Sequence, residues 1–101
     1  MSSEPVSELH LISRRSDERA WAVCRSRAEA GAHVEVVLIH DAVLETESTL
    51  SELLGEADPP AVTILACSED AIRRKVEERW ALIDYAGVID HCARAARVTT
   101  W

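Results

Sequence analysis

The chain has 101 residues, 48% of them hydrophobic, and a formal net charge of −7. These values predict one globular domain with a modest core. They make direct nucleic-acid binding unfavourable, because an acidic protein lacks the field that attracts phosphate. Three cysteines without close spacing do not suggest a disulfide framework. We expect a soluble, cytoplasmic protein, since the sequence shows neither a signal peptide nor an apolar run of about 18 residues.

Apolar runs alternate with helix-forming stretches along the chain, which predicts βαβ units and a mostly parallel sheet with helices on both faces. The fold class is therefore α/β, a three-layer α/β/α domain with a small five-stranded sheet. The predicted strands cover residues 8–13, 33–39, 61–67, 81–83 and 98–101. The predicted helices cover residues 16–30, 50–57, 68–78 and 85–95.

Breakers and capping residues mark the boundaries of these elements. Gly31 ends the first helix, Pro59 and Pro60 force an extended entry to the third strand, and Asp84 caps the last helix. The second strand is apolar almost throughout, which indicates that it is covered on both faces. We expect residues 1–7 to form a flexible N-terminal tail and residues 8–101 to form a single domain.

Cys67 occupies the most informative position in the chain. It closes an apolar strand and is followed by Ser68, a predicted N-cap, and by Glu69 and Asp70 in the first helical turn. The carboxyl end of a parallel strand is where open α/β sheets bind ligands. A helix start also lowers a thiol pKa and favours a nucleophilic thiolate. The alternative is a buried thiol that packs as a small apolar residue.

Two further groups are candidates to support Cys67. His40 follows the second strand, so it would lie close to Cys67 if strands two and three are neighbours, and an imidazole can activate a thiol. Arg73 and Arg74 form a short basic cluster that would lower the thiol pKa or bind an anionic partner. For these arginines we favour the alternative, a solvated helix face whose charges pair with nearby acids.

The remaining cysteines have the spacing of core residues. Cys24 shares a helix face with Trp21 and Ala28, and Cys92 lies on the apolar face of the last helix. A metal site needs three or four converging ligands, which the spacing of the histidines and cysteines does not supply. The three glycines form no phosphate-binding loop. We therefore expect no cofactor and no metal.

Four short stretches are informative through their shared order and spacing: residues 9–14, 37–41, 68–74 and 82–90, followed by Trp101. Together they resemble the small DsrE/DsrF/DsrH and TusB/TusC/TusD sulfur-relay proteins, and most of all the DsrH/TusB branch. The third stretch is similar to that branch's N-E-D-x-x-A-R-G motif, and the fourth to its D-Y-x-x-F-V-x-L motif. Ala42 and Lys75 stand where that family carries glycine.

This resemblance implies a three-layer fold with a five-stranded parallel sheet. It also implies dimers, or hexamers with related DsrE/DsrF-like or TusC/TusD-like subunits. The implied activity is the passage of sulfane sulfur as a cysteine persulfide, in tRNA wobble-uridine 2-thiolation or in sulfur oxidation. A small sulfur-carrier protein would be the donor or the acceptor. Cys67 falls where the DsrE/TusD branch carries its persulfide cysteine, and Cys24 where the DsrH branch carries its own.

Three functions are therefore open. In the first, the chain is a sulfurtransferase subunit whose Cys67 thiolate, stabilised by the helix start and by Arg73 or Arg74, accepts sulfane sulfur. In the second, it is a non-catalytic scaffold subunit of the same kind of oligomer, which a buried and unreactive Cys67 would favour. In the third, it is a small α/β regulatory or binding protein, which a monomer without thiol reactivity would favour.

Overall fold

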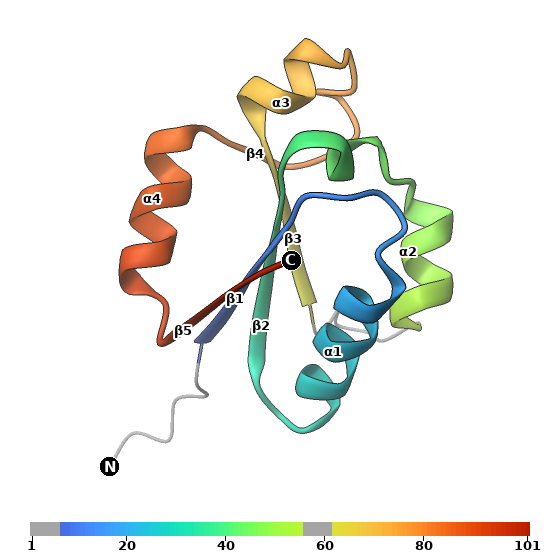
Figure 1. The fold of residues 1–101 in the computed structure, drawn as a ribbon, viewed down its shortest axis with the longest axis vertical. Helices are drawn as coiled ribbons and strands as arrows, with labels where there is room; N and C mark the ends of the chain where they lie inside the picture. Colours follow the sequence, from blue (N-terminus) through green and yellow to red (C-terminus); the bar gives the residue numbers. More distant parts are fainter. Residues whose placement is uncertain (1–6, 56–61) are drawn as a thin grey trace.

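The computed structural model of the protein describes residues 7–55 and 62–101. Its strands are β1 (Ser7–Ile12), β2 (His33–Leu38), β3 (Val62–Cys67), β4 (Leu82–Ile83) and β5 (Arg97–Thr100). Its helices are α1 (Glu18–Glu29), α2 (Glu47–Leu54), α3 (Ser68–Arg73) and α4 (Tyr85–Arg94), with a 3-10 helix η1 (His40–Leu44). The strands form one all-parallel sheet in the order β4-β3-β2-β1-β5 (Figure 1). The predicted α/β fold is confirmed.

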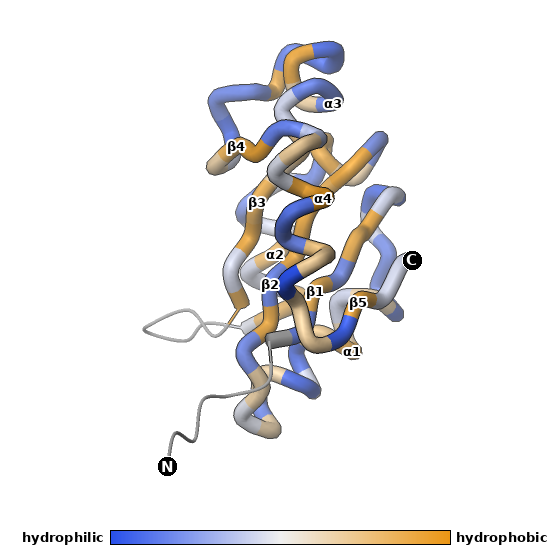
Figure 2. Tube along the Cα trace, turned by 90° about the vertical axis from the view of Figure 1, so that its left-hand side faces the viewer, coloured by the Kyte–Doolittle hydropathy of each residue, from blue (hydrophilic) through white to orange (hydrophobic). Residues whose placement is uncertain are grey.

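The order of the strands explains where the helices lie. From β1 to β4 the chain steps in one direction across the sheet, and β5 then returns to the free side of β1. Crossovers between parallel strands are right-handed, so a connection that reverses direction must lie on the opposite face. Figure 1 shows this arrangement, with α1 and α2 on one face of the sheet and α4 on the other. Figure 2, turned by 90°, shows α4 in front of the strands.

Two apolar clusters fill the space between the sheet and its helices. The larger cluster includes Trp21 of α1 and Val36 of β2. The smaller cluster joins Leu9, Val37 and Val88 beneath α4. Val36 and Val37 point to opposite faces of the pleated strand, and both are fully buried. Strand β2 is therefore covered on both sides, as predicted, and each buried valine contributes about 1.5–3 kcal/mol to stability.

The start of α2 differs from the sequence prediction. The helix begins at Glu47, three positions earlier than expected, because Thr46 caps it. The side chain of Thr46 accepts a hydrogen bond from the backbone N–H of Thr49 at 3.3 Å, which satisfies one of the unpaired donors of the first turn. The cap is a short-range signal that the apolar pattern alone did not reveal.

Helix α3 is shorter than predicted. It ends at Arg73 instead of near Glu78, and Lys75 adopts a left-handed backbone conformation with φ of 58°. That conformation ends a right-handed helix and is uncommon for residues other than glycine. In the part of the chain that the structure describes, no helix is long and apolar enough to cross a membrane.

Some predictions fall outside the described residues. They concern residues 1–6 of the expected tail, the end of the second predicted helix near Ala57, and the segment 59–61 that enters the third strand. Ser7, which was expected in the tail, is the first residue of β1. The ordered sheet therefore begins one residue earlier than the predicted domain.

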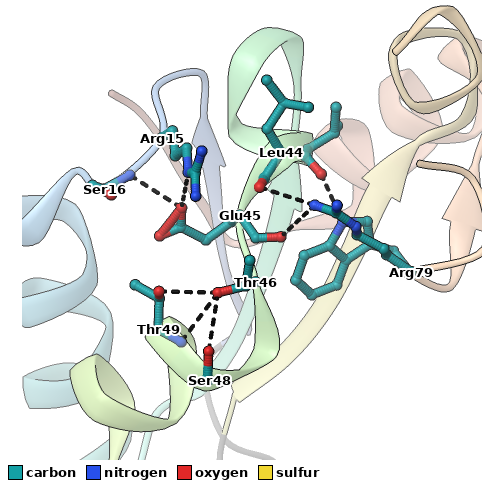
Figure 3. Close-up of polar contacts among 10 residues, drawn as sticks. Arg15, Ser16, Leu44, Glu45, Thr46, Ser48, Thr49 and Arg79 are labelled. Carbon is teal, nitrogen blue, oxygen red and sulfur yellow. Dashed lines mark hydrogen bonds and ion pairs between the residues drawn. The ribbon is translucent and has the colours of Figure 1, made fainter. Parts of the chain in front are cut away.

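A buried carboxylate anchors the segment that leads from η1 into α2 (Figure 3). Glu45 is 1% exposed. Its Oε2 accepts a hydrogen bond from the backbone N–H of Ser16 at 3.3 Å and lies 3.7 Å from Nε of Arg15. On the other side, Arg79 donates to the carbonyl oxygens of Leu44 and Glu45 at 3.1 and 3.5 Å. These contacts tie the segment after β1, the end of η1 and the segment before β4 to one another.

Candidate functional site

The candidate site is the edge of the sheet where β2 and β3 end. The two strands are neighbours, which is the condition under which His40 was expected to lie close to Cys67, and Leu38 pairs with Ala66 next to their carboxyl ends. The chain then turns into η1 at His40 and into α3 at Ser68. Sequence-distant residues around Cys67 and His40 therefore meet at one edge.

This edge is not the point where the strand order reverses. The reversal lies between β1 and β5, where open α/β sheets usually leave a crevice for a ligand. Here the hydroxyl of Ser13 donates to the carbonyl oxygen of Trp101 at 2.8 Å, and the N–H of Trp101 donates to the carbonyl oxygen of Leu11 at 2.9 Å. These bonds join the two segments. Cys67 lies on β3, with β2 between it and β1.

The Cys67 side chain is completely buried. Its Sγ lies 3.7 Å from Oε1 of Glu69, to which it donates a weak hydrogen bond. Burial is the main cause that raises the pKa of the Cys67 thiol, and the carboxylate of Asp70 adds to it. The backbone N–H groups of Asp70 and Glu69 lower the pKa of the thiol, but the net shift is still upward. The expected low thiol pKa is therefore wrong for this conformation.

Ser68 does not cap α3 as expected. Strand β3 runs through Cys67, so Cys67 itself is the N-cap residue and makes no side-chain capping bond. Ser68 is the first helical residue, and its hydroxyl donates to Oε1 of Glu69 at 2.8 Å. That bond is the largest cause that lowers the pKa of Glu69. The serine therefore orients a carboxylate next to the thiol instead of capping the helix.

Asp70 is the buried charge of the site and is 1% exposed. Its Oδ2 accepts a hydrogen bond from the backbone N–H of His40 at 2.9 Å. Its Oδ1 lies 3.5 Å from Nη1 of Arg74 and 4.0 Å from Nδ1 of His40. The sequence showed Asp70 only as an acid in the first turn of a helix, which does not reveal that it links α3 to the end of β2.

His40 is close to the site but is not paired with the thiol. Its side chain is 62% exposed, and its ring nitrogen Nδ1 faces the carboxylate of Asp70. The described residues include no hydrogen bond between His40 and Cys67. Because β2 and β3 are neighbours, the two residues lie at the same edge of the sheet, as was expected for that strand order. The hydrogen bond that Asp70 accepts from His40 comes from the backbone, and the exposed imidazole lies 4.0 Å from the same carboxylate.

The two arginines differ from each other. Arg74 lies 3.1 Å from Asp41 and 3.5 Å from Asp70, so it forms an ion-pair cluster between α3 and η1. Arg73 is exposed. Neither guanidinium is a main cause of the pKa shift at Cys67. The interpretation of Arg74 as a residue paired with nearby acids is confirmed.

Tyr85 is a residue of this site that the sequence reasoning missed. It is 48% exposed at the start of α4, and its backbone N–H donates to Oε2 of Glu69 at 3.4 Å. The carboxylate of Asp70 and then the thiol of Cys67 raise the pKa of its phenol. Tyr85 is therefore a half-exposed residue in the neighbourhood of the buried thiol. The sequence feature that could have indicated its place is that Tyr85 directly follows the helix cap Asp84.

Cys24 and Cys92 lie in the two apolar clusters, as their helical spacing predicted. Cys24 is fully buried, and burial together with the nearby Glu8 carboxylate raises its pKa to about 12. Cys92, on α4, is half-buried and packs against the smaller cluster. All three cysteines are free thiols. The environment of Cys24 does not favour a thiolate, so its proposed role as a sulfur carrier gains no support.

The described ranges contain no group of three His, Cys, Asp or Glu side chains placed to hold a metal ion. An open pocket of about 740 Å³ lies elsewhere, between α1, α2 and the start of β3. Leu50, Val62 and Trp80 line its apolar part, and Arg25 and Arg79 line its polar part. Cys67, Asp70 and His40 are not among its lining residues. The pocket and the carboxyl edge are separate features.

No protein-family model matches the chain, and no curated protein matches it.

Proposed function

We propose that the chain is a subunit of a cytoplasmic sulfur-relay assembly, in which it supports its partners without carrying sulfur on its own thiols. The resemblance over residues 9–101 supports the sulfur-relay assignment, and it implied the α/β fold with a parallel sheet. Its partners would be related DsrE/DsrF-like or TusC/TusD-like subunits, or further copies of itself. The pathway served would be tRNA thiolation or sulfur oxidation.

The observation that carries the supporting role is the complete burial of Cys67. The thiolate is the nucleophile in sulfur transfer, and burial raises the pKa of this thiol. The carboxylates of Glu69 and Asp70 lie beside it. These carboxylates repel a thiolate, and they would also repel a persulfide anion at the same position, because it is negatively charged too.

A second candidate function is supported by the backbone around Cys67. The N–H groups of Glu69 and Asp70 lower the pKa of the thiol, so a movement that exposed the sulfur would leave a favourable site for an anion. The Cys67 thiolate would then attack the outer sulfur of a donor persulfide. The sulfur–sulfur bond of the donor breaks, the donor leaves as a thiolate, and Cys67 becomes the persulfide. An acceptor thiolate would remove that sulfur in the same way.

Alkylation of each cysteine in the native protein against pH, read by mass spectrometry before and after treatment with a persulfide donor, distinguishes these functions. For the supporting role we expect Cys67 and Cys24 to react only after unfolding and to gain no sulfur. The half-buried Cys92 provides an internal positive control for the reagent. If native Cys67 alkylates with a pKa below about 8.5 and gains sulfur mass, the supporting role is wrong and the carrier function replaces it.

The matched variants are Cys67→Ser and Cys92→Ser. Under the supporting role, Cys67→Ser leaves sulfur transfer by the assembled partners unchanged, as Cys92→Ser does. Under the carrier function, Cys67→Ser abolishes persulfide loading and Cys92→Ser does not. Removal of the whole chain from the assembly should reduce transfer in both cases, and unchanged transfer without the chain would overturn the sulfur-relay assignment itself.

A further inference from the structure

Strand β5 forms an open edge of the sheet. It pairs with β1 on one side, with Leu9 opposite Val98 and Leu11 opposite Thr100. The N–H of Trp101 donates to the carbonyl oxygen of Leu11, so the backbone groups of Trp101 point toward β1. Backbone groups alternate in direction along a strand. The N–H and C=O groups of Val98 and Thr100 therefore point away from the sheet.

This edge carries few of the features that keep sheet edges from pairing. Proteins protect an edge with lysine, proline, inward-pointing charges, bulges or very short strands. The opposite edge is short, since β4 has two residues. Strand β5 has four residues, Arg97 is its one charge, and it contains neither lysine nor proline. Val98 is 41% exposed, so the edge is accessible to another strand.

We propose that β5 pairs antiparallel with β5 of a second copy of this chain, about a two-fold axis that passes beside Thr99. An isologous pair places the same patch on both subunits. Centring the pair on Thr99 sets Val98 of one copy opposite Thr100 of the other. Both outward-facing residues of each strand then exchange N–H···O=C bonds, and the two five-stranded sheets become continuous.

The side chains fit this register. Val98 and Thr100, which lie on one face, would form a cross-strand pair of β-branched residues. On the other face, Arg97 would lie opposite Trp101 of the second copy, within reach of a cation–π contact. The indole is already positioned, because it stacks on His10 at 6.2 Å between ring centroids and donates to His10 Nδ1 at 3.1 Å.

Charge does not oppose the contact at this edge, although the chain as a whole is acidic. Strand β5 contains no acid. The two copies of Arg97 would stand four residues apart along the joined strands, about 13 Å, which exceeds the screening length of about 8 Å at physiological salt. The proposed function allows self-association without naming a surface, and this interaction assigns one. It does not depend on the sulfur-relay assignment, since it involves none of the thiols.

Oxidative cross-linking tests the register directly. In the proposed pair Thr99 faces Thr99 of the second copy in a non-hydrogen-bonded position, where Cβ atoms come closest. We expect Thr99→Cys to form a disulfide to itself between copies under mild oxidation, identified as the cross-linked peptide by mass spectrometry. The matched control Thr100→Cys faces Val98 and should not link to itself. Equal cross-linking of both variants, or none with Thr99→Cys, overturns the register.

Sedimentation velocity over a range of protein concentrations tests the dimer itself. The wild-type chain should be a concentration-dependent dimer. Thr100→Pro removes an N–H that points away from β1, so it should abolish the dimer while the fold, followed by circular dichroism, persists. Thr100→Val keeps that N–H and should remain dimeric. If Thr100→Pro does not fold, Val98→Lys, which places a charge on the same edge, serves instead. A wild-type chain that stays monomeric, or a dimer that survives both Thr100→Pro and Val98→Lys, overturns the proposal.

Discussion

The buried carboxylate of Asp70 accepts a hydrogen bond from the backbone N–H of His40 at 2.9 Å. These residues come from different connections, since His40 follows β2 and Asp70 lies in α3. His40 adopts a left-handed backbone conformation with φ of 50°, which residues other than glycine rarely adopt. The bond thus joins a strained turn to a short helix, and it fixes the edge of the sheet that contains Cys67.

Replacement of Asp70 should destabilise the protein more than replacement of its exposed neighbour Asp41. Asp70→Ala leaves the His40 N–H and Arg74 without their buried acceptor, for which we expect a loss of about 1–3 kcal/mol. Asp41 is 69% exposed, and its pair with Arg74 should contribute less than about 1 kcal/mol. Urea unfolding of Asp70→Ala and Asp41→Ala measures both. Equal losses would contradict a specific role for Asp70.

His40 should tolerate glycine and reject a β-branched residue. Glycine adopts positive φ without steric cost, whereas a left-handed residue with a side chain is destabilised by about 1–2 kcal/mol. We expect His40→Gly to unfold at the same or a higher urea concentration than the wild type, with a gain of up to about 1 kcal/mol. His40→Val should unfold at a lower concentration. A less stable glycine variant would show that the imidazole itself stabilises the fold.

The charge of Asp70 should contribute to the raised pKa of Cys67, in addition to burial. Its carboxylate is one of the causes that raise the thiol pKa, whereas its backbone N–H lowers it. Asp70→Asn removes the charge and keeps the N–H, so the pKa of Cys67 should fall. The ultraviolet absorbance of the thiolate against pH, compared with a Cys67→Ser background, measures the change. Asp41→Asn is the control for an exposed charge, and a similar fall there would contradict the assignment.

Mild acid should weaken the fold through His10. Its imidazole is buried, lies beside Glu8 and Trp101, and is also affected by the charge of Arg27. Burial lowers its pKa, against the opposing effect of the Glu8 carboxylate. The unfolded chain therefore binds a proton near pH 6.5 while the native protein does not, so stability falls as pH decreases from about 6.5 toward the lower native pKa.

The variant His10→Asn isolates this effect, because its amide oxygen can still accept the bond from Trp101 but cannot titrate in this range. In the wild type, the urea concentration at the midpoint of unfolding should be lower at about pH 5.5 than at about pH 7. In the variant, this concentration should change much less. The pKa of Glu8 is lowered, chiefly by its hydrogen bond with Arg27. The stability that this carboxylate contributes is lost only at a lower pH than the range in which His10 titrates. Equal pH dependence of both proteins would contradict the role of His10.

The sequence alone left open whether β2 and β3 are neighbours. It predicted the alternation of strands and helices. It did so because apolar runs, caps such as Asp84 and breakers such as Gly31 act over a few residues. It also predicted that Cys24 lies in the core, which follows from helical spacing. The lengths of α2 and α3 were less accurate, since Thr46 and the left-handed Lys75 decide them.

Only the tertiary structure decided the chemistry of the edge around Cys67. A helix start lowers a thiol pKa locally, and the sequence displays that feature. Burial and the carboxylate of Asp70 oppose it, and both depend on how α3, η1 and the neighbouring strands pack together. The position of Tyr85 near the sulfur and the position of β5 at the edge of the sheet likewise depend on how the elements are arranged in space. The sequence by itself determined which elements form, because that is local physics, whereas the structure decided which charges and surfaces meet, because contacts between distant residues set desolvation and pairing.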